Sequence, residues 1–430
     1  MPSDRLIWNI QYIYKAMKIL YITRSPPYPL TIAGNQRTAR LYRALAQNGE
    51  VDLFLAIDEH ELPTQHLVEI RKGFKLIGLS SPLLRSQLAP WRFLRPLAPR
   101  LIDRLADYLA NRRKDYLSDP RLSSELKKTM EQNRYDVVVC KGLALAMKTG
   151  ISPDFPFVLD VDDAEQEWFQ SQIDYPNGGW VVRMVAAWRW AQLKTVVPNL
   201  YRRFSRLWLV KSSDIAIPGL ENAITIGVPF CLPKEGLPPL SPSDPASRIV
   251  MLLGSYYHRP NAEGLDWFIR QVWPLVRAEV PDAEFRVIGP GLAVRRAEAY
   301  SRMSGVRVLG PVPSVVPHYQ ECAFTIAPIW TGAGINVKVF ESYAYGRPCV
   351  LTPFAFRGYE ECLEDGVSVR VAKSPEDFAH ACAALLRDPA LRDRLAAAGH
   401  PRVMKDFSFE RFAGAVGQTF AALQDGAPHG

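Results

Sequence analysis

Residues 328–348 read PIWTGAGINVKVFESYAYGRP, and this pattern decides the fold of the second half of the chain. A strand is expected to end just before two glycines, Gly332 and Gly334, which allow the backbone to approach a ligand closely. Residues 336–345 then form a good helix pattern. The free N–H groups at the start of this helix, roughly those of residues 334–337, predict an anion site.

Lys338 and Glu341 are three residues apart, so they share one face of this helix. A lysine supplies positive charge for a phosphate, and a carboxylate accepts hydrogen bonds from two hydroxyl groups of a ribose or a sugar. Strand, glycine loop, helix start, lysine and glutamate together predict a site for a nucleotide-linked anion. The alternative is a surface ion pair, worth less than about 0.5 kcal/mol, after an ordinary glycine loop.

Short apolar runs alternate with longer helical patterns in two series. The expected strands of the first half are 18–23, 51–56, 74–79, 135–140, 156–161 and 206–211. Those of the second half are 248–253, 284–288, 306–309, 323–327, 349–351 and 367–371. Near-continuous apolar strands separated by helices predict parallel sheets that are covered on both faces. Two such series predict an α/β protein with two doubly wound domains.

A stretch with six prolines at residues 228–247 marks the expected join between the domains. Proline-rich linkers of this kind are semi-rigid. We expect residues 17–227 to form the first domain and residues 248–405 the second. Residues 406–430 are expected to form a terminal helical segment, and residues 1–16 an extension before the first strand.

The glycine loop and its helix resemble the donor-sugar motif of group 1 (family 4) retaining glycosyltransferases of the GT-B fold. The subgroup has Gly-x-Gly, then Lys-Val-x-Glu, then a small-residue run that ends Gly-x-Pro-Val-Val. Residues 332–334, 338–341 and 346–350 occupy those places here. Many members carry a further Glu eight residues before the helix Glu, and that position is Ala333 in this chain. This difference from the family motif removes a carboxylate that is thought to touch the donor sugar or to help it leave the nucleotide.

The resemblance implies two Rossmann-like domains that face each other across a cleft, with the C-terminal helix 409–423 packed back on the first domain. It implies that Glu341 holds the nucleotide ribose and Lys338 the diphosphate, and we expect both to act in catalysis. The backbone that would contact the sugar or a phosphate is that of Gly334, Ile335, Asn336 and Val337.

The implied reaction moves a sugar from a nucleoside diphosphate sugar to a hydroxyl of a glycan or lipid-linked acceptor, with anomeric retention. Bacterial polysaccharide or glycoconjugate synthesis is the expected setting. The enzyme would stabilise the departing diphosphate electrostatically and would need no metal and no cofactor besides the nucleotide sugar. Two alternatives stay open: an epimerase of the same fold, and a non-catalytic scaffold that binds sugar nucleotides or a membrane surface.

Other strand ends resemble further parts of a donor site. Gly254 ends the first strand of the second half, and Arg259 is a candidate for the phosphate cation, with a solvated loop residue as the equal alternative. Gly289 and Val312 lie at the expected base-binding rim. Gly34 follows the first strand of the chain and matches a glycine loop that faces the donor across the cleft.

Three aspartates gather at the end of the expected strand 156–161. Asp160 and Asp162 are candidates to orient an acceptor hydroxyl or to take its proton. Asp163 is predicted instead to cap the following helix, as is Asn261 in the second half.

The positive charge of the chain lies in its first half. Residues 1–210 hold 30 Lys and Arg against 21 Asp and Glu, whereas residues 211–430 hold 22 against 23. The excess is concentrated in residues 85–134 and 180–211, and tryptophans are interleaved in the second of these runs. A basic, aromatic surface suits an anionic membrane, and no nucleic-acid motif is present. The candidate membrane or acceptor surface comprises Arg183, Trp188, Arg189, Trp190, Arg202 and Arg203.

Composition excludes other classes of protein. The 430 residues are 48% apolar and 22% charged, which is typical of a globular chain. No run of about 18–20 apolar residues predicts a membrane-spanning helix, and the N-terminus has no signal-peptide pattern. The six cysteines are scattered without metal-ligand spacing. We therefore expect a cytoplasmic protein whose first domain contacts the inner face of the plasma membrane.

Overall fold

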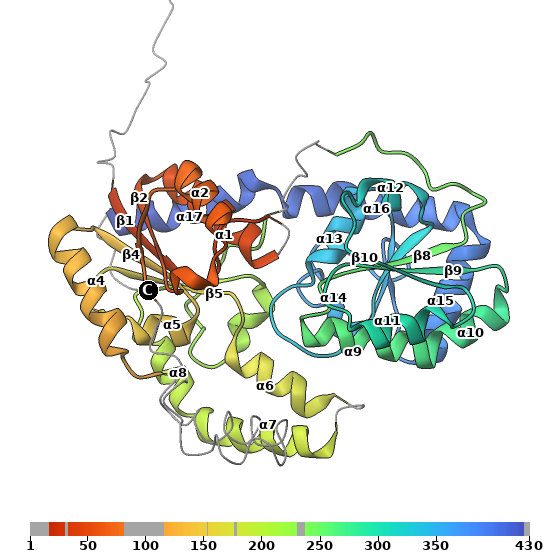
Figure 1. Ribbon diagram of the computed structural model, residues 1–430, viewed down its shortest axis with the longest axis horizontal. Helices are drawn as coiled ribbons and strands as arrows, with labels where there is room; N and C mark the ends of the chain where they lie inside the picture. Colours follow the sequence, from red (N-terminus) through yellow and green to blue (C-terminus); the bar gives the residue numbers. More distant parts are fainter. Residues whose placement is uncertain are drawn as a thin grey trace, which may run out of the picture.

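A computed structural model gives the fold of the chain. It describes residues 17–30, 33–80, 116–152, 154–175, 179–229 and 237–424. The expected extension, residues 85–115 of the basic run, residues 230–236 of the proline-rich join and the last six residues lie outside these ranges. Figure 1 shows two α/β units side by side, each built on its own sheet.

The first sheet is parallel and has seven strands in the order β3-β2-β1-β4-β5-β6-β7. The strands are β1 (Met17–Thr23), β2 (Gly49–Leu55), β3 (Leu76–Leu79), β4 (Val137–Lys141), β5 (Phe157–Val161), β6 (Arg206–Leu209) and β7 (Ile224–Thr225). Six of them lie on the predicted apolar runs. The edge strand β7 has only two residues, too few to produce a readable pattern.

Both faces of the first sheet are buried, as predicted for parallel strands. Ile19 and Tyr21 of β1 belong to the cluster on one face, and Leu20 and Ile22 belong to the cluster on the other. All four side chains are fully buried. The first face is covered by α1 (Ala33–Ala46), α2 (Thr64–Gly73) and α17 (Phe409–Gln424). The second is covered by α4 (Pro120–Asn133), α5 (Leu143–Lys148) and α8 (Val196–Tyr201).

Two further helices of the first unit extend below this sheet in the view of Figure 1. They are α6 (Glu165–Asp174) and α7 (Trp180–Leu193), which pack against each other. Short 3-10 turns η1 (Glu59–Glu61) and η4 (Ser212–Ala216) complete the described part of this unit. Helix α6 starts directly after β5, so it begins at the carboxyl-end edge of the first sheet.

The second sheet is also parallel, with six strands in the order β10-β9-β8-β11-β12-β13. The strands are β8 (Ile249–Leu253), β9 (Glu284–Ile288), β10 (Val306–Gly310), β11 (Phe324–Ala327), β12 (Cys349–Leu351) and β13 (Arg370–Val371). Each overlaps a predicted run. The two parallel sheets confirm the predicted fold class of two doubly wound α/β units.

Helices cover both faces of the second sheet. One face carries α9 (Arg259–Trp267), the π-helical turn η5 (Phe268–Val272), α10 (Trp273–Glu279), α11 (Val294–Ser301) and α15 (Pro375–Arg387). The other carries α12 (Val316–Glu321), α13 (Val337–Ala344), α14 (Pro353–Phe356) and α16 (Pro389–Asp406). The free cysteines of the described residues are all buried.

The C-terminal helix α17 crosses back to the first sheet, as the resemblance implied (Figure 1). Its buried face includes Phe412, Val416 and Phe420, which join the apolar cluster around β1. The indole Nε1 of Trp208 in β6 donates a hydrogen bond of 2.9 Å to Thr419 Oγ1. The last helix of the chain thus completes the core of the first domain.

Replacing Phe420 with Ala should lower the free energy of unfolding by about 3–5 kcal/mol, because it removes a buried ring and leaves a cavity. The exposed neighbour Gln418 provides the control, and Gln418→Ala should change it by less than about 0.5 kcal/mol. Urea denaturation followed by tryptophan fluorescence measures both. Equal stability of the two variants would show that α17 is not part of this core.

Candidate functional site

The loop between β11 and α13 matches the predicted glycine loop. Gly332 and Gly334 have φ angles of 124° and 72°, which side-chain-bearing residues rarely adopt. Asn336 is the N-cap residue, and the helix runs from Val337 to Ala344, within one residue of the predicted bounds at each end. The segment Thr331–Asn336 is called the donor loop below.

Lys338 and Glu341 both lie half-buried on α13. The Lys338 Nζ donates a hydrogen bond of 2.8 Å to Asn261 Oδ1, and burial lowers the pKa of Lys338 to about 8. Burial also raises the pKa of Glu341 to about 7, although the charge of Lys338 acts in the opposite direction. In an exposed ion pair, the pKa of the lysine stays at its ordinary value or rises, and the pKa of the glutamate stays at its ordinary value or falls. The surface ion-pair alternative therefore does not describe these residues.

Asn261 does not cap α9, so that prediction was wrong. The N-cap residue is His258, and the Asn261 Nδ2 donates 2.9 Å to the carbonyl oxygen of Ser255 while its Oδ1 accepts from Lys338. Asn261 thus joins the turn after β8 to the ammonium group on α13. Gly254 lies directly against it, since a Cβ at this position would be 3.1 Å from Asn261 Nδ2.

The other predicted donor residues have different surroundings. Gly289 packs so closely on the turn after β8 that a Cβ there would lie 1.9 Å from the Gly254 carbonyl oxygen. Val312 is half-buried in the small cluster under β8 and β9. Arg259 is exposed, and its Nε pairs with Glu263 Oε1 at 2.5 Å. The guanidinium of Arg259 therefore has a partner on its own helix.

The opposite wall of the site comes from the first sheet. Asp160 is fully buried and its Oδ1 pairs with Arg37 Nη2 at 2.5 Å. Burial raises the pKa of Asp160, and the charge of Arg37 opposes this. Asp162 is partly exposed and pairs with Lys141 at 2.8 Å and with Arg37 at 3.2 Å. Burial alone raises the pKa of Asp162, but the charges of Lys141 and Arg37 outweigh it and lower that pKa.

These contacts give the two candidate aspartates different surroundings. Asp160 lies too deep to meet a substrate and holds Arg37 in place, whereas Asp162 reaches the solvent. Gly34 joins the same wall, because a Cβ at Gly34 would lie 4.0 Å from Lys141 Nζ. The structure therefore brings Gly34, Lys141 and Asp162 together at the carboxyl end of the sheet.

Asp163 does not cap α6, so this prediction was also wrong. The N-cap residue is Ala164, which makes no side-chain capping bond. Asp163 instead faces the donor loop of the other domain, since a Cβ on Gly334 would lie 2.5 Å from Asp163 Oδ1. Its side chain keeps contact with solvent, yet desolvation of the carboxyl group by the surrounding protein and the charge of Asp162 raise its pKa to about 7.

Helix α6 also contacts the donor loop. The Gly332 N–H donates 2.9 Å to Ser171 Oγ, and the Gly334 N–H donates 3.1 Å to Glu167 Oε2. The N–H of Val337 donates 3.1 Å to the carbonyl oxygen of Ile335. Two of the four amides expected to form an anion site, those of Gly334 and Val337, thus already have protein acceptors.

The candidate membrane surface divides into two parts. On α7, Trp180, Met184 and Trp188 are 71%, 56% and 36% exposed, and the four-residue spacing puts them on one side of the helix. Arg183 is exposed, Arg189 is half-buried and Trp190 stacks on Phe169. Arg202 and Arg203 lie beyond α8, where Arg202 pairs with Glu221 at 3.0 Å. Trp208 is a core residue, as expected for part of the aromatic set.

Five charged groups near the contact between the two domains could not be predicted from the sequence. Each has a partner more than 20 positions away, and none stands in a local motif that indicates this contact. These residues are Arg37, Lys141, Glu167, Lys211 and Arg357.

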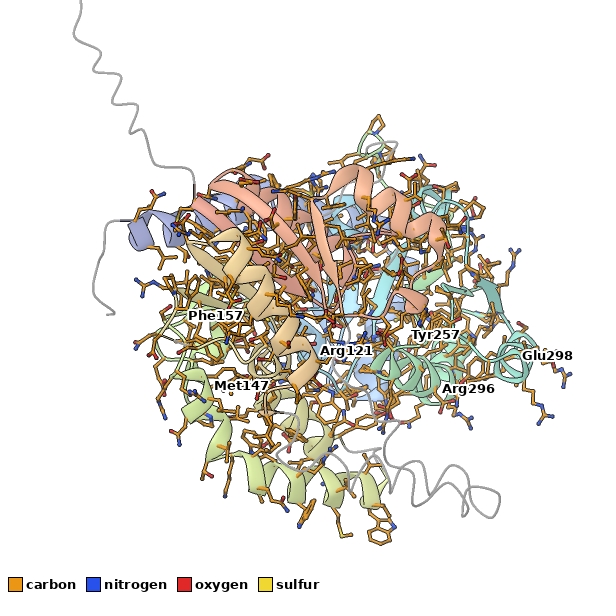
Figure 2. All side chains as sticks on the ribbon, turned by 60° about the vertical axis from the view of Figure 1, so that its left-hand side comes forward. Arg121, Met147, Phe157, Tyr257, Arg296 and Glu298 are labelled. Atoms are coloured by element: carbon orange, nitrogen blue, oxygen red, sulfur yellow. The ribbon has the colours of Figure 1, made fainter. Side chains whose placement is uncertain are left out.

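The stability of the protein should fall between pH 4.5 and pH 7 because of Glu341. Its folded pKa of about 7 exceeds the ordinary value of 4.5, so its contribution is fully present below pH 4.5 and is lost as the pH rises through 7. Glu341→Gln should make this fall smaller by about 1–3 kcal/mol. Glu298→Gln is the control, since Figure 2 shows Glu298 on the outer surface of α11. Urea denaturation at several pH values measures the slope, and an unchanged slope in Glu341→Gln contradicts the assignment.

Comparisons with known proteins agree with this architecture. Residues 247–388 match the sequence model of the family described as glycosyl transferases group 1. A search of curated proteins finds no match.

Solved structures share the arrangement of both domains. Sucrose-phosphate synthase from Thermosynechococcus elongatus has a TM-score of 0.65 and 14% identity, over 96% of this chain and 100% of that chain. The Anabaena HepE protein has a TM-score of 0.59 and 14% identity, over 94% and 100%. TarM has a TM-score of 0.65 and 9% identity, over 95% and 99%. Residues 247–388 thus match the sequence model of group 1 glycosyltransferases, and the two facing sheets have the GT-B fold of these solved structures.

Proposed function

We propose that the protein transfers a sugar from a nucleoside diphosphate sugar to a hydroxyl group of a glycan or lipid-linked acceptor. The observation that carries this proposal is the half-buried pair on α13. Lys338 is held by a neutral amide and not by a carboxylate, and its pKa is lowered. Such a cation gains stability when an anionic ligand binds beside it.

The roles follow from the surroundings of each residue. Lys338, positioned by Asn261, contacts the diphosphate and stabilises the charge that develops on it as it departs. Glu341, three residues along the same helix face, accepts hydrogen bonds from the ribose hydroxyls. The family match over the second domain supports these assignments, because both residues lie within the matched range.

Retention follows if the acceptor hydroxyl attacks on the face from which the diphosphate leaves. The bond from the anomeric carbon to the diphosphate oxygen breaks as the bond to the acceptor oxygen forms. Asp162, whose pKa is lowered, stays ionised and orients the acceptor hydroxyl. Asp163 faces the donor loop with a pKa of about 7, which suits it to accept the proton of that hydroxyl. Asp160 holds Arg37 behind them.

Similar solved structures support the substrate class. A HepE structure contains UDP and glucose, and an S. aureus TarM structure contains Fondaparinux, alpha-GlcNAc-glycerol and UDP. WaaB, with a TM-score of 0.54 and 12% identity, is a lipopolysaccharide outer core galactosyltransferase. We extend nucleotide-sugar binding and an acceptor of bacterial cell-surface type to this chain by analogy with these proteins.

Thermal unfolding with UDP, GDP and dTDP tests donor binding. One of the three should raise the melting temperature by a few degrees at saturating concentration. Lys338→Ala should weaken its binding by about 10- to 100-fold, because the lost contact is a hydrogen bond to a charged group. Lys405→Ala, at an exposed lysine of α16, is the matched control and should bind normally. If none of the three stabilises the wild type, the donor site is wrong.

An assay of sugar transfer distinguishes a glycosyltransferase from a non-catalytic binding scaffold. The wild type should glycosylate a sugar or polyprenyl acceptor with retention, which NMR of the product anomeric proton reports. Binding of the nucleotide sugar without transfer or hydrolysis would favour the scaffold.

We further propose that α7 places the first domain on an anionic membrane. Its exposed apolar residues lie beside the exposed Arg183 and Lys194, and α7 itself contains no acidic residue. This combination suits the interface of a bilayer with anionic headgroups. Among the described residues, no helix has the length and hydropathy needed to span a bilayer.

Sedimentation with vesicles tests this surface. Binding should be stronger to vesicles with phosphatidylglycerol than to pure phosphatidylcholine, and it should weaken as salt screens the charges. Trp180→Ser should reduce binding by about fivefold or more, because it removes a large apolar contact. Val294→Ser, at a residue of α11 that is 72% exposed, is the control. Equal loss in both variants, or no preference for anionic lipid, contradicts the proposal.

A further inference from the structure

A group of charges, two of them buried and one partly exposed, joins the two domains at the donor loop. Glu167 on α6 and Lys211 after β6 form an ion pair in the first domain, and both side chains are almost completely buried. Arg357, which follows α14 in the second domain, contributes its Nη1 at 2.9 Å from Glu167 Oε1. The other carboxylate oxygen of Glu167 accepts the N–H of Gly334 at 3.1 Å. One carboxylate therefore meets both the donor loop and a cation of the opposite domain.

The charges balance only when the domains are together. Asp214 shares Lys211 at 3.2 Å, so the first domain alone places two carboxylates around one ammonium group. Burial raises the pKa of Asp214 to about 6, which leaves it mostly ionised at neutral pH. Arg357 supplies the second positive charge. Because a buried charge without a partner is costly, the group favours the arrangement in which Arg357 is inserted.

Neighbouring contacts hold the same two segments against each other. Ser212 Oγ donates 2.5 Å to Glu361 Oε1 across the domain boundary. Gly358, between these points, has a φ of 88°, and a Cβ there would lie 2.9 Å from both Lys211 Cγ and Ile335 Cδ1. The segment 357–361 thus packs between the end of β6 and the donor loop.

We propose that Glu167 is a positioning residue for sugar transfer, which fixes the donor loop from the acceptor domain and is itself held by Arg357 and Lys211. This inference rests on the proposed function of the donor site. The carboxylate does not touch the reacting atoms in this role. It orders the backbone around Ala333, together with the Ser171 bond to Gly332, only when the cleft is closed.

Glu167→Gln keeps the size of the side chain and removes its charge. We expect kcat to fall by about 10- to 100-fold, since small displacements of a site cost this much, while the affinity for the nucleoside diphosphate changes less than about threefold. Arg357→Gln should have a similar effect. The kcat of the double variant should be no more than about twofold below that of the less active single variant, because both residues act through one contact. Arg357→Lys should recover part of the rate.

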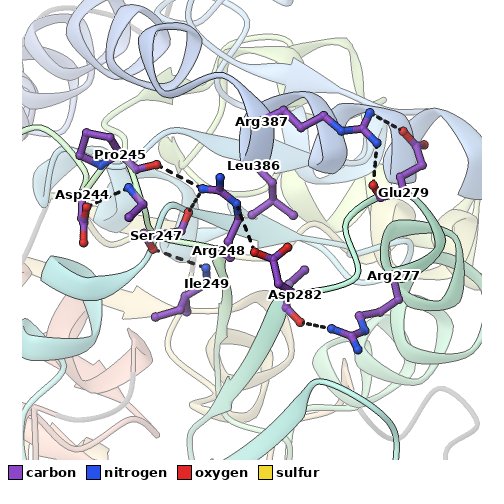
Figure 3. Close-up of polar contacts among 12 residues, drawn as sticks. Asp244, Pro245, Ser247, Arg248, Ile249, Arg277, Glu279, Asp282, Leu386 and Arg387 are labelled. Carbon is purple, nitrogen blue, oxygen red and sulfur yellow. Dashed lines mark hydrogen bonds and ion pairs between the residues drawn. The ribbon is translucent and has the colours of Figure 1, made fainter.

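Arg387→Gln is the matched control. Arg387 pairs with Glu279 at 2.9 Å, the same distance as the Arg357 pair, but within the second domain and on its surface (Figure 3). It should leave kcat and the donor affinity unchanged. Equal losses in the Arg387 and Arg357 variants, or a normal kcat in Glu167→Gln, overturn the proposal.

Domain closure can be measured by cross-linking, without an assay of catalytic activity. With Cys231 replaced by Ser, the pair Ser212→Cys and Glu361→Cys should be joined rapidly by a short bis-maleimide. Adding Glu167→Gln should slow the cross-linking by about fivefold or more, because the closed arrangement is less populated. Unchanged cross-linking overturns the inference even if the protein has no transferase activity. If Glu167→Gln slows cross-linking as expected but the nucleotide does not bind, only the proposed donor site is contradicted.

Discussion

The structure depends on one constraint: the carboxyl ends of two parallel sheets face each other and must be held there. Residues after β5 and β6 meet residues after β11 and β12, and the buried carboxylate of Glu167 joins them through Arg357 and Gly334. The returning helix α17 ties the end of the chain to the first sheet. Polar groups that follow the strands are therefore concentrated where the two sheets face each other, at the edge where doubly wound sheets bind their ligands.

The same constraint explains the electrostatics of the cleft. Closely packed walls desolvate the groups between them, so the pKa values of Lys338, Glu341 and Asp163 all shift toward the neutral form. On the first sheet, Arg37 and Lys141 keep Asp162 ionised, so neighbouring aspartates have different protonation behaviour. Such differences assign separate roles to residues of one type.

Local patterns predicted the sheets, the donor loop and the positions of Lys338 and Glu341, because strand hydrophobicity and helix periodicity act over a few residues. Capping was predicted less well, since Asp163 and Asn261 fit a capping pattern locally but turn to partners on other segments. Glu167 could not be predicted as a cleft residue, because its partner Arg357 lies 190 positions later and the contact exists only through the packing of two domains. Asp160 was placed near the site, but its depth depends on Arg37 of another helix.

The most direct test of the donor site is a crystal structure with the nucleoside diphosphate that stabilises the protein most. We expect a phosphate oxygen at about 2.7–3.2 Å from Lys338 Nζ and the ribose hydroxyls on Glu341, with Asp163 facing the free end of the diphosphate. A nucleotide bound away from α13, with its phosphates on another surface, would contradict the proposed roles of Lys338 and Glu341.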